Sequence, residues 1–164
     1  RVTNDRLLIA LDKLNELQPA VKHRHQGIFG SRRTAVQVLI EPDSEEMHQQ
    51  TALKKRLLRF FPFHFCRRAQ TTGTKAILQN QILISDRSPF RVSRKHCIID
   101  TVGDSVFIED KTSQLGTVVN GIPIGGNSQE TRVKLIHGSN TLVLGGQDSH
   151  VRFRLDVSVP DQAV

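Results

Sequence analysis

The sequence has no hydrophobic run that approaches the roughly 20 residues of a membrane-spanning helix. Its first residues also lack the apolar stretch and the small-residue cleavage site of a secretory signal. We therefore expect no membrane span, and the sparse cysteines considered next favour a cytoplasmic location. Because the first residue is Arg, we also expect these 164 residues to be a piece of a longer protein.

Cysteine is scarce. The two cysteines, Cys66 and Cys97, lie in strand-like surroundings, which favours free, partly buried thiols over a disulfide framework. A single bridge between them is the alternative. Without a Cys-x-x-Cys pair, the nearest approach to a zinc site is the set His64, Cys66, His96 and Cys97, and we favour no metal and no cofactor.

Motifs of catalysis are missing as well. The chain has no Gly-x-Ser-x-Gly elbow, no phosphate-binding loop of the nucleotide-hydrolase type and no paired-carboxylate motif. Ser93 and His96 lie close in sequence, but no such motif accompanies them. We expect a protein that is not an enzyme and keep an enzyme as the alternative.

The composition is that of a soluble globular domain with an appendage, with 37% hydrophobic residues and both signs of charge. The net charge of +7 implies attraction to anions, which include phosphorylated proteins, nucleic acids and anionic membrane surfaces. No nucleic-acid-binding module is recognisable in the sequence, so a nucleic-acid partner is not favoured.

The chain begins with a helical pattern. Five leucines recur at three- and four-residue spacing, the period of an amphipathic helix, and Pro19 marks its end: Leu7, Leu8, Leu11, Leu14 and Leu17. A lone helix of this length is marginal in water, so it must pack on an upstream domain, on a second copy of the chain as a homodimer, or on the domain that follows. We assign 1–19 to this helix and 20–33 to a basic linker.

From residue 34 the pattern is that of strands. Short apolar or alternating runs are separated by turn residues, and Asn120-Gly121 is the strongest hairpin signal. Residues 45–55 predict either a hairpin loop or a short surface helix. The expected strands are 35–40, 57–66 (with Phe61, Phe63 and Phe65 on one face), 82–84, 97–99, 105–108, 117–119, 122–124, 133–136, 141–144 and 151–157. This pattern indicates an all-β sandwich or barrel over 34–158, with a tail at 159–164.

Two polar segments between strands indicate a binding surface. The first, residues 92–96, offers the hydroxyl of Ser93, the guanidinium of Arg94, an ammonium and an imidazole. These groups form charge-assisted hydrogen bonds to phosphate oxygens. The second, residues 113–121, contains glycines whose backbone can fold tightly against a ligand.

Three segments together resemble the signature of the forkhead-associated (FHA) family of phosphothreonine-binding modules. They follow the family order Gly-Arg, Ser-Arg-x-His and Ser-x-Asn-Gly-Thr-x-x-Asn-Gly. Here they read Phe65-Cys66-Arg67, Ser93-Arg94-Lys95-His96 and Ser113-Gln114-Leu115-Gly116-Thr117-Val118-Val119-Asn120-Gly121. Cys66 replaces the family's Gly and Leu115 its Asn. The resemblance implies a β-sandwich of two twisted antiparallel sheets, which selects the sandwich over the barrel.

The resemblance also implies roles for single residues. The phosphopeptide-binding residues would be Arg67, Ser93, Arg94, Gln114 and Leu115. The residues that support the site would be His96, Gly116, Thr117 and Asn120. Leu115 cannot make the peptide main-chain bond of the Asn it replaces, so the grip on the peptide would have to come from elsewhere.

We therefore expect a phosphothreonine-dependent interaction module of a larger signalling or regulatory protein, whose partner is a substrate of a Ser/Thr kinase. The alternative is an FHA fold with a degenerate pocket that serves as a phospho-independent docking or oligomerisation domain. Cys66 and Leu115 motivate that alternative.

Overall fold

The computed structural model describes residues 36–51, 55–69 and 77–159. The helix expected at 1–19, the linker at 20–33 and all but the first residue of the tail at 159–164 lie outside these ranges. Among the described residues, no helix is long and apolar enough to cross a membrane.

The described residues form two sheets of six strands each. The first sheet has the order β2-β1-β12-β11-β8-β9, with bounds Arg56–Leu58, Gln37–Pro42, Arg152–Ser158, Gly138–Leu144, Thr117–Val119 and Ile122–Ile124. The second has the order β10-β7-β6-β3-β5-β4, with bounds Arg132–Lys134, Ser105–Asp110, Cys97–Val102, Phe63–Arg67, Gln81–Ile84 and Ile77–Leu78. The predicted all-β sandwich is confirmed, except that β3 and β5 run parallel where we expected only antiparallel pairs.

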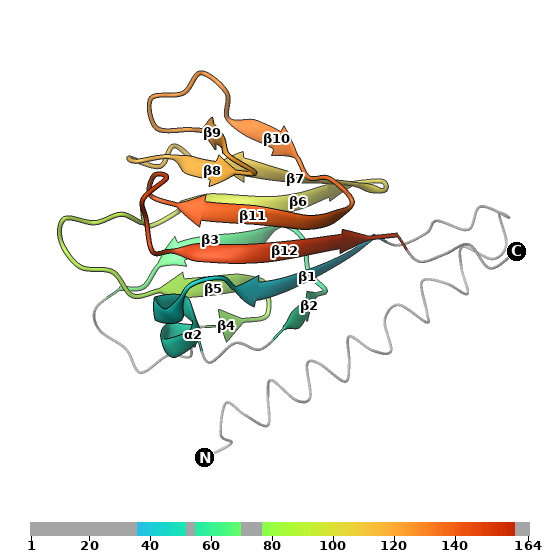
Figure 1. Ribbon diagram of the computed structural model, residues 1–164, viewed down its shortest axis with the longest axis horizontal. Helices are drawn as coiled ribbons and strands as arrows, with labels where there is room; N and C mark the ends of the chain where they lie inside the picture. Colours follow the sequence, from blue (N-terminus) through green and yellow to red (C-terminus); the bar gives the residue numbers. More distant parts are fainter. Residues whose placement is uncertain (1–35, 52–54, 70–76, 160–164) are drawn as a thin grey trace, which may run out of the picture. The chain divides into compact units, whose positions relative to one another are not determined.

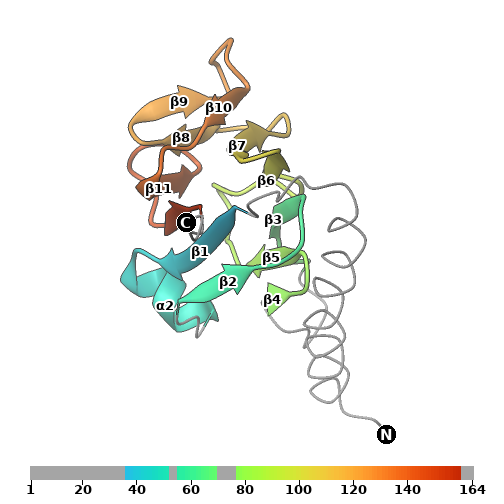
Figure 2. The ribbon, with the colours of Figure 1, turned by 90° about the vertical axis from the view of Figure 1, so that its right-hand side faces the viewer.

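The two sheets pack face to face around one apolar core. In Figure 1, β11 and β12 lie in front of β6 and β3, and in Figure 2, β8, β11 and β1 lie to the left of β7, β6 and β3. Phe65 of β3 and Phe153 of β12 join the layers, with ring centroids 5.4 Å apart and both side chains fully buried. Burial of each large apolar side chain stabilises the fold by about 1.5–3 kcal/mol.

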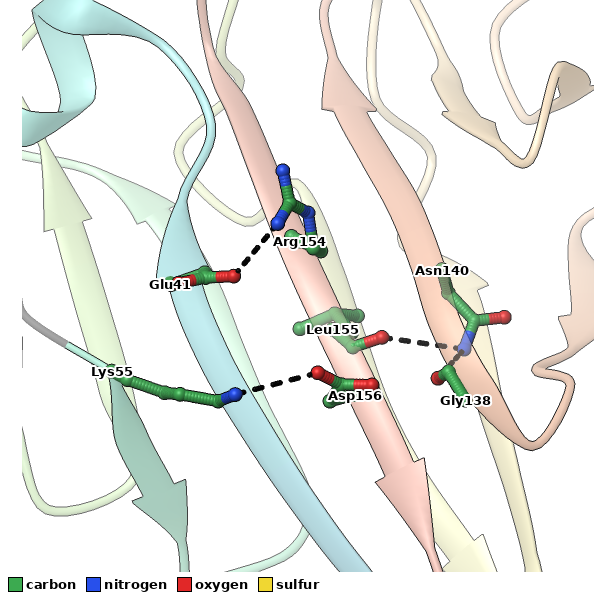
Figure 3. Close-up of polar contacts among 7 residues, drawn as sticks. All are labelled: Glu41, Lys55, Gly138, Asn140, Arg154, Leu155 and Asp156. Carbon is green, nitrogen blue, oxygen red and sulfur yellow. Dashed lines mark hydrogen bonds and ion pairs between the residues drawn. The ribbon is translucent and has the colours of Figure 1, made fainter.

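Strand β12 shows why the alternating sequence becomes a sandwich strand. Its apolar residues point into the core, and its charged residues form the outer face (Figure 3). On that face Arg154 pairs with Glu41 at 3.1 Å and Asp156 pairs with Lys55 at 3.5 Å. These pairs are solvent-exposed and contribute little energy, so the core face fixes the strand.

The expectation that residues 57–66 form a single strand is wrong. The run forms two strands in different sheets, β2 (Arg56–Leu58) and β3 (Phe63–Arg67), with a crossing between them that contains Pro62. Proline lacks the N–H that a ladder needs, so a break at this point is consistent with its chemistry. Phe63 and Phe65 are buried as expected.

Residues 45–51 settle the alternative left open for this segment, because they form helix α2 (Glu45–Thr51). The Ser44 hydroxyl accepts a hydrogen bond from the Met47 N–H at 3.3 Å, as an N-cap does. Met47 is fully buried in the core cluster, so packing holds this short helix in place.

The hairpin predicted at Asn120-Gly121 is present, and a second hairpin joins β6 to β7. β6 and β7 are joined by Gly103-Asp104, and β8 and β9 by Asn120-Gly121. Asn120 and Gly121 have φ of 50° and 79°, which is the left-handed backbone that a two-residue hairpin of the primed type needs.

Asn140 of β11 is a buried polar residue with a complete set of partners. Its side-chain amide donates to the carbonyl oxygens of Ile136 (2.8 Å), Gly138 and Leu155, the last two shown in Figure 3. Its Oδ1 accepts from the Ile136 N–H and from Asn120, both at 2.9 Å. One side chain thus ties the β10–β11 connection to β12 and to the β8–β9 turn.

We expect Asn140→Ala to lower the free energy of unfolding by roughly 2–4 kcal/mol, because the buried Leu155 carbonyl and the partly buried backbone groups of Ile136 and Gly138 lose their partner at once. Urea denaturation measures the change. Asn127→Ala, at an exposed position, is the matched control and should cost less than about 0.5 kcal/mol. Equal stability of both variants would contradict the role given to Asn140.

Candidate functional site

A hollow of about 1210 Å³ lies where the β5–β6 and β7–β8 connections meet the outer face of the second sheet. Both connections emerge at the left of the sandwich in Figure 1. Four cationic side chains are among its lining: Arg67, Arg94, Lys95 and Lys111. The carboxylate of Glu109 also lines it and pairs with Lys111 at 3.2 Å.

Ser93 is fixed in this hollow through its backbone N–H, its carbonyl oxygen and its hydroxyl. Its N–H donates to His96 Nδ1 at 3.0 Å, and its carbonyl oxygen accepts from the Arg67 N–H at 3.1 Å. Its Oγ accepts from the Gln114 N–H at 3.0 Å. A hydroxyl that accepts in this way keeps its own proton for a ligand acceptor.

His96 lies fully buried beneath Ser93 and joins the two connections. Because Nδ1 accepts the Ser93 N–H, the proton of the neutral ring is on Nε2, which donates to the carbonyl oxygen of Gly116 at 2.9 Å. Burial lowers the pKa of His96 below its ordinary value of 6.5, against smaller opposite effects from the Gly116 carbonyl, Asp110 and Asp86. The fold therefore favours the neutral imidazole.

Arg67 ends β3 and is held at both its backbone and its side chain. Besides the backbone bond to Ser93, Nη1 donates to the carbonyl oxygen of Val92 at 3.2 Å. The guanidinium carbon lies 3.8 Å from the ring centroid of Phe90. These contacts use one guanidinium N–H and one face, and other N–H groups remain for a ligand.

Asp110, at the end of β7, organises the second connection. Its buried carboxylate accepts hydrogen bonds from the Ser113 N–H at 2.9 Å, from the Ser113 hydroxyl, and from the Thr117 hydroxyl at 2.7 Å. The Ser113 hydroxyl oxygen accepts in turn from the Gly116 N–H at 3.0 Å. The sequence reasoning missed Asp110, although Asp side chains commonly bond the backbone of the turn beside them.

Asp86 organises the first connection in the same manner. Its Oδ2 accepts the N–H groups of Arg91 and Val92 at 2.7 and 2.8 Å. Just before it, the backbone N–H and carbonyl of Ser85 are bonded by the side chain of Gln50 from α2, at 3.0 and 2.9 Å. The sequence reasoning missed both residues, and the Gln50 contact, across 35 positions, has no local signal.

The structure brings together most of the predicted phosphopeptide ligands. Arg67, Ser93, Arg94 and Gln114 all line the cationic hollow described above. Leu115 does not; it is 49% exposed and lines a separate hollow of about 550 Å³.

The predicted supporting residues lie below or beside the cationic hollow. His96 lines it from beneath, and Gly116 and Thr117 bond His96 and Asp110 respectively. Asn120 lies at the β8–β9 turn, where it bonds Asn140 and the Thr141 N–H. It does not line the hollow.

The two cysteines are free. Burial raises the pKa of Cys66, although Lys95 partly offsets this, and burial raises the pKa of the fully buried Cys97 well above its ordinary value. Both ring nitrogens of His96 have partners, so it cannot serve in the zinc set considered above. Within the described ranges, no three His, Cys, Asp or Glu side chains gather in a way that could hold a metal ion.

These features define a β-sandwich that presents a cationic hollow on two connections at one end. Residues 71–145 match the family model of the FHA domain. The match includes the segments 93–96 and 113–121.

Solved structures share the fold. The yeast Pml1 splicing factor is similar with a TM-score of 0.54 and 17% identity, over 83% of this chain and 90% of that chain. The FHA domain of an Arabidopsis thaliana hypothetical protein is similar with a TM-score of 0.50 and 18% identity, over 82% of this chain and 95% of that chain. Among curated proteins, none matches this sequence.

We expect the domain to lose stability as the pH falls below about 6.5, the unfolded pKa of histidine. Because the folded pKa of His96 is lowered, the unfolded chain binds the proton more readily, so the free energy of unfolding rises with pH in this range. Urea denaturation between pH 7.5 and about 5 should show the free energy of unfolding to fall by up to roughly 1.4 kcal/mol for each pH unit.

The variant His96→Gln should show a weaker pH dependence than the wild type, although it is less stable at pH 7.5. The exposed His137 gives the matched control, since His137→Gln should keep the wild-type dependence. An unchanged slope in His96→Gln would remove His96 as the cause.

We expect Gly125→Ala to destabilise the site. A Cβ at Gly125 would lie 2.0 Å from the carboxylate of Asp110, so the carboxylate must move and lose its partners. Gly103→Ala is the matched control, because Gly103 also has a positive φ but nothing within 4 Å of its Cβ position. Urea denaturation should show Gly125→Ala to cost about 2 kcal/mol or more beyond Gly103→Ala. Equal losses would mean that backbone strain alone matters.

Proposed function

We propose that this FHA domain docks its parent protein onto a partner phosphorylated on threonine, and that it has no catalysis of its own. The observation that carries the proposal is the bonding of Ser93 to both Arg67 and Gln114. Groups from three separate segments are thereby placed around one hollow. The family to which the domain belongs supports the choice of phosphothreonine.

The chemistry of the hollow suits a phosphate dianion. A phosphate offers three strong acceptor oxygens and close to two negative charges at neutral pH. The Ser93 hydroxyl and the guanidinium of Arg67 donate from fixed positions, and the exposed Arg94 and Gln114 can add further bonds. Charge-assisted hydrogen bonds contribute roughly 1.5–3 kcal/mol each.

The supporting network suits a site that must be rigid before the ligand arrives. His96 fixes Ser93, and Asp110 fixes the turn that carries Gln114. A preorganised site spends less of its binding energy on ordering its own loops.

The wider setting is part of the same proposal. The domain would belong to a larger cytoplasmic signalling or regulatory protein, and its partner would be a substrate of a Ser/Thr kinase. The helix expected at 1–19 would join the domain to an upstream domain or pair two copies as a homodimer.

A second candidate is a phospho-independent docking function. Leu115 and Ile122 are 49% and 50% exposed, and every residue that lines the second hollow beside Leu115 is uncharged. Such a surface suits an apolar partner segment. Binding that is equal with and without phosphate would favour this candidate.

We expect peptides from a degenerate pool with one fixed phosphothreonine to bind, and the matched threonine and phosphoserine pools to bind less. For a peptide selected from the pool, Arg67→Ala and Ser93→Ala should each weaken binding about tenfold or more, by calorimetry, because each removes a charge-assisted bond. Arg59→Ala is the control, since Arg59 is an exposed arginine outside the hollow. Unchanged affinity in both site variants would refute the proposal.

We expect the affinity for the selected peptide to fall as the pH drops below about 6, where the phosphate dianion takes up a proton and becomes a monoanion. A peptide with a difluoromethylene phosphonate, which keeps its second charge at lower pH, serves as the control. It should retain its affinity at about pH 5.5. Equal losses of affinity for both peptides would mean that a change in the protein, and not protonation of the phosphate, weakens binding at low pH.

A further inference from the structure

Phe90 is an aromatic residue at the rim of the hollow with 36% of its surface exposed. Its ring faces the guanidinium of Arg67, with the guanidinium carbon 3.8 Å from the ring centroid. This is the geometry of a cation–π contact.

The loop around Phe90 is itself fixed. Two residues on, Val92 is buried, and the Asp86 carboxylate holds the N–H groups of Arg91 and Val92. Phe90 is therefore presented by a segment with its own anchors, and it does not depend on Arg67 for its place.

The Arg67 guanidinium is thus restrained in two directions. The ring of Phe90 lies against its face, and the carbonyl oxygen of Val92 accepts from Nη1. Both restraints come from the β5–β6 connection, which also carries Ser93. A shift of this connection would move the Arg67 head group and the Ser93 hydroxyl together.

This arrangement bears on the departure at position 66, where the FHA signature has Gly and this chain has Cys. The backbone at position 66 is not the only determinant of the direction of the Arg67 side chain. The Phe90 ring and the Val92 carbonyl oxygen also restrain its guanidinium.

We propose that Phe90 is a positioning residue for phosphate recognition, whose ring holds the Arg67 guanidinium in the orientation that receives a phosphate oxygen. The inference rests on the proposed function and adds a residue to it. A freely rotating arginine side chain loses rotamer freedom when it binds a ligand, whereas a stacked arginine has already lost part of that freedom before binding.

The test uses the phosphothreonine peptide selected from the pool and the full chain. Phe90→Leu keeps an apolar side chain but removes the ring, and it should weaken binding about three- to tenfold by calorimetry. Phe90→Trp keeps a ring with a stronger face and should restore affinity to within about twofold of the wild type. Exchange of the Val92 amide hydrogen, held by Asp86, should be unchanged in both variants, which shows that the loop is intact.

A double-mutant cycle separates positioning from direct contact. In the Arg67→Ala background, Phe90→Leu should have no further effect on affinity, because the residue through which Phe90 acts is absent. In the free wild-type protein, the proton resonances of the Arg67 side chain should be shifted upfield by the ring current. Phe90→Leu should abolish this shift, and Phe90→Trp should keep it.

The outcomes are distinguishable. If the wild type and Phe90→Leu bind the peptide equally well, the inference is overturned and the proposed function stands. The same holds if Phe90→Leu lowers the affinity as much in the Arg67→Ala background as in the wild-type background. The absence of a ring-current shift at Arg67 in the free protein would overturn the inference in the same way. If no phosphothreonine peptide of the pool binds the wild type, the proposed function falls and the inference falls with it.

Discussion

The candidate site depends on one buried imidazole that is kept neutral. His96 accepts the Ser93 N–H at one ring nitrogen and donates to the Gly116 carbonyl at the other, so the two connections that form the hollow are joined through a single side chain. A charged imidazole would carry a proton on both nitrogens and could not accept the Ser93 N–H. Burial opposes that charge. The position of the Ser93 hydroxyl thus follows from the protonation state of the residue beneath it.

Around this imidazole, two carboxylates hold the loops that form the site. Asp110 and Asp86 each accept N–H groups of the loop beside them, and in this way each connection keeps its shape without a regular ladder. The cations are placed differently, since Arg94 and Lys95 are exposed and Arg67 is held by Phe90 and Val92. Asp86 and Asp110 therefore use their acceptor oxygens within the loops, whereas Arg94 and Lys95 remain at the surface. This division explains how a loop pair with several carboxylates nearby can still present a cationic hollow.

Much of the fold could be predicted from the sequence because its signals are local. The alternation in 151–157 predicted β12, and Asn120-Gly121 predicted a hairpin that the structure contains. The run at 57–66 was misjudged, since its apolar character is the same whether Leu58 and Phe63 lie in one strand or in opposite sheets. Of the expected phosphopeptide ligands, Arg67, Ser93, Arg94 and Gln114 line one hollow, but Leu115 lies in another. The side chains of consecutive residues in a tight loop can lie on different sides of it, and a sequence motif does not encode which side each one takes.

The sequence by itself determined the strand pattern, the turn positions and the kinds of donor available to an anion, since each of these depends on a residue and its near neighbours. Only the tertiary structure decided which donors meet. The contact of Phe90 with Arg67 and the two hydrogen bonds of Gln50 with Ser85 join segments that are far apart in the chain. Such contacts arise from the packing of two sheets and from the parallel pairing of β3 with β5. They carry no periodic signal in the sequence, because the separation between the partners is set by the path of the chain through the sandwich.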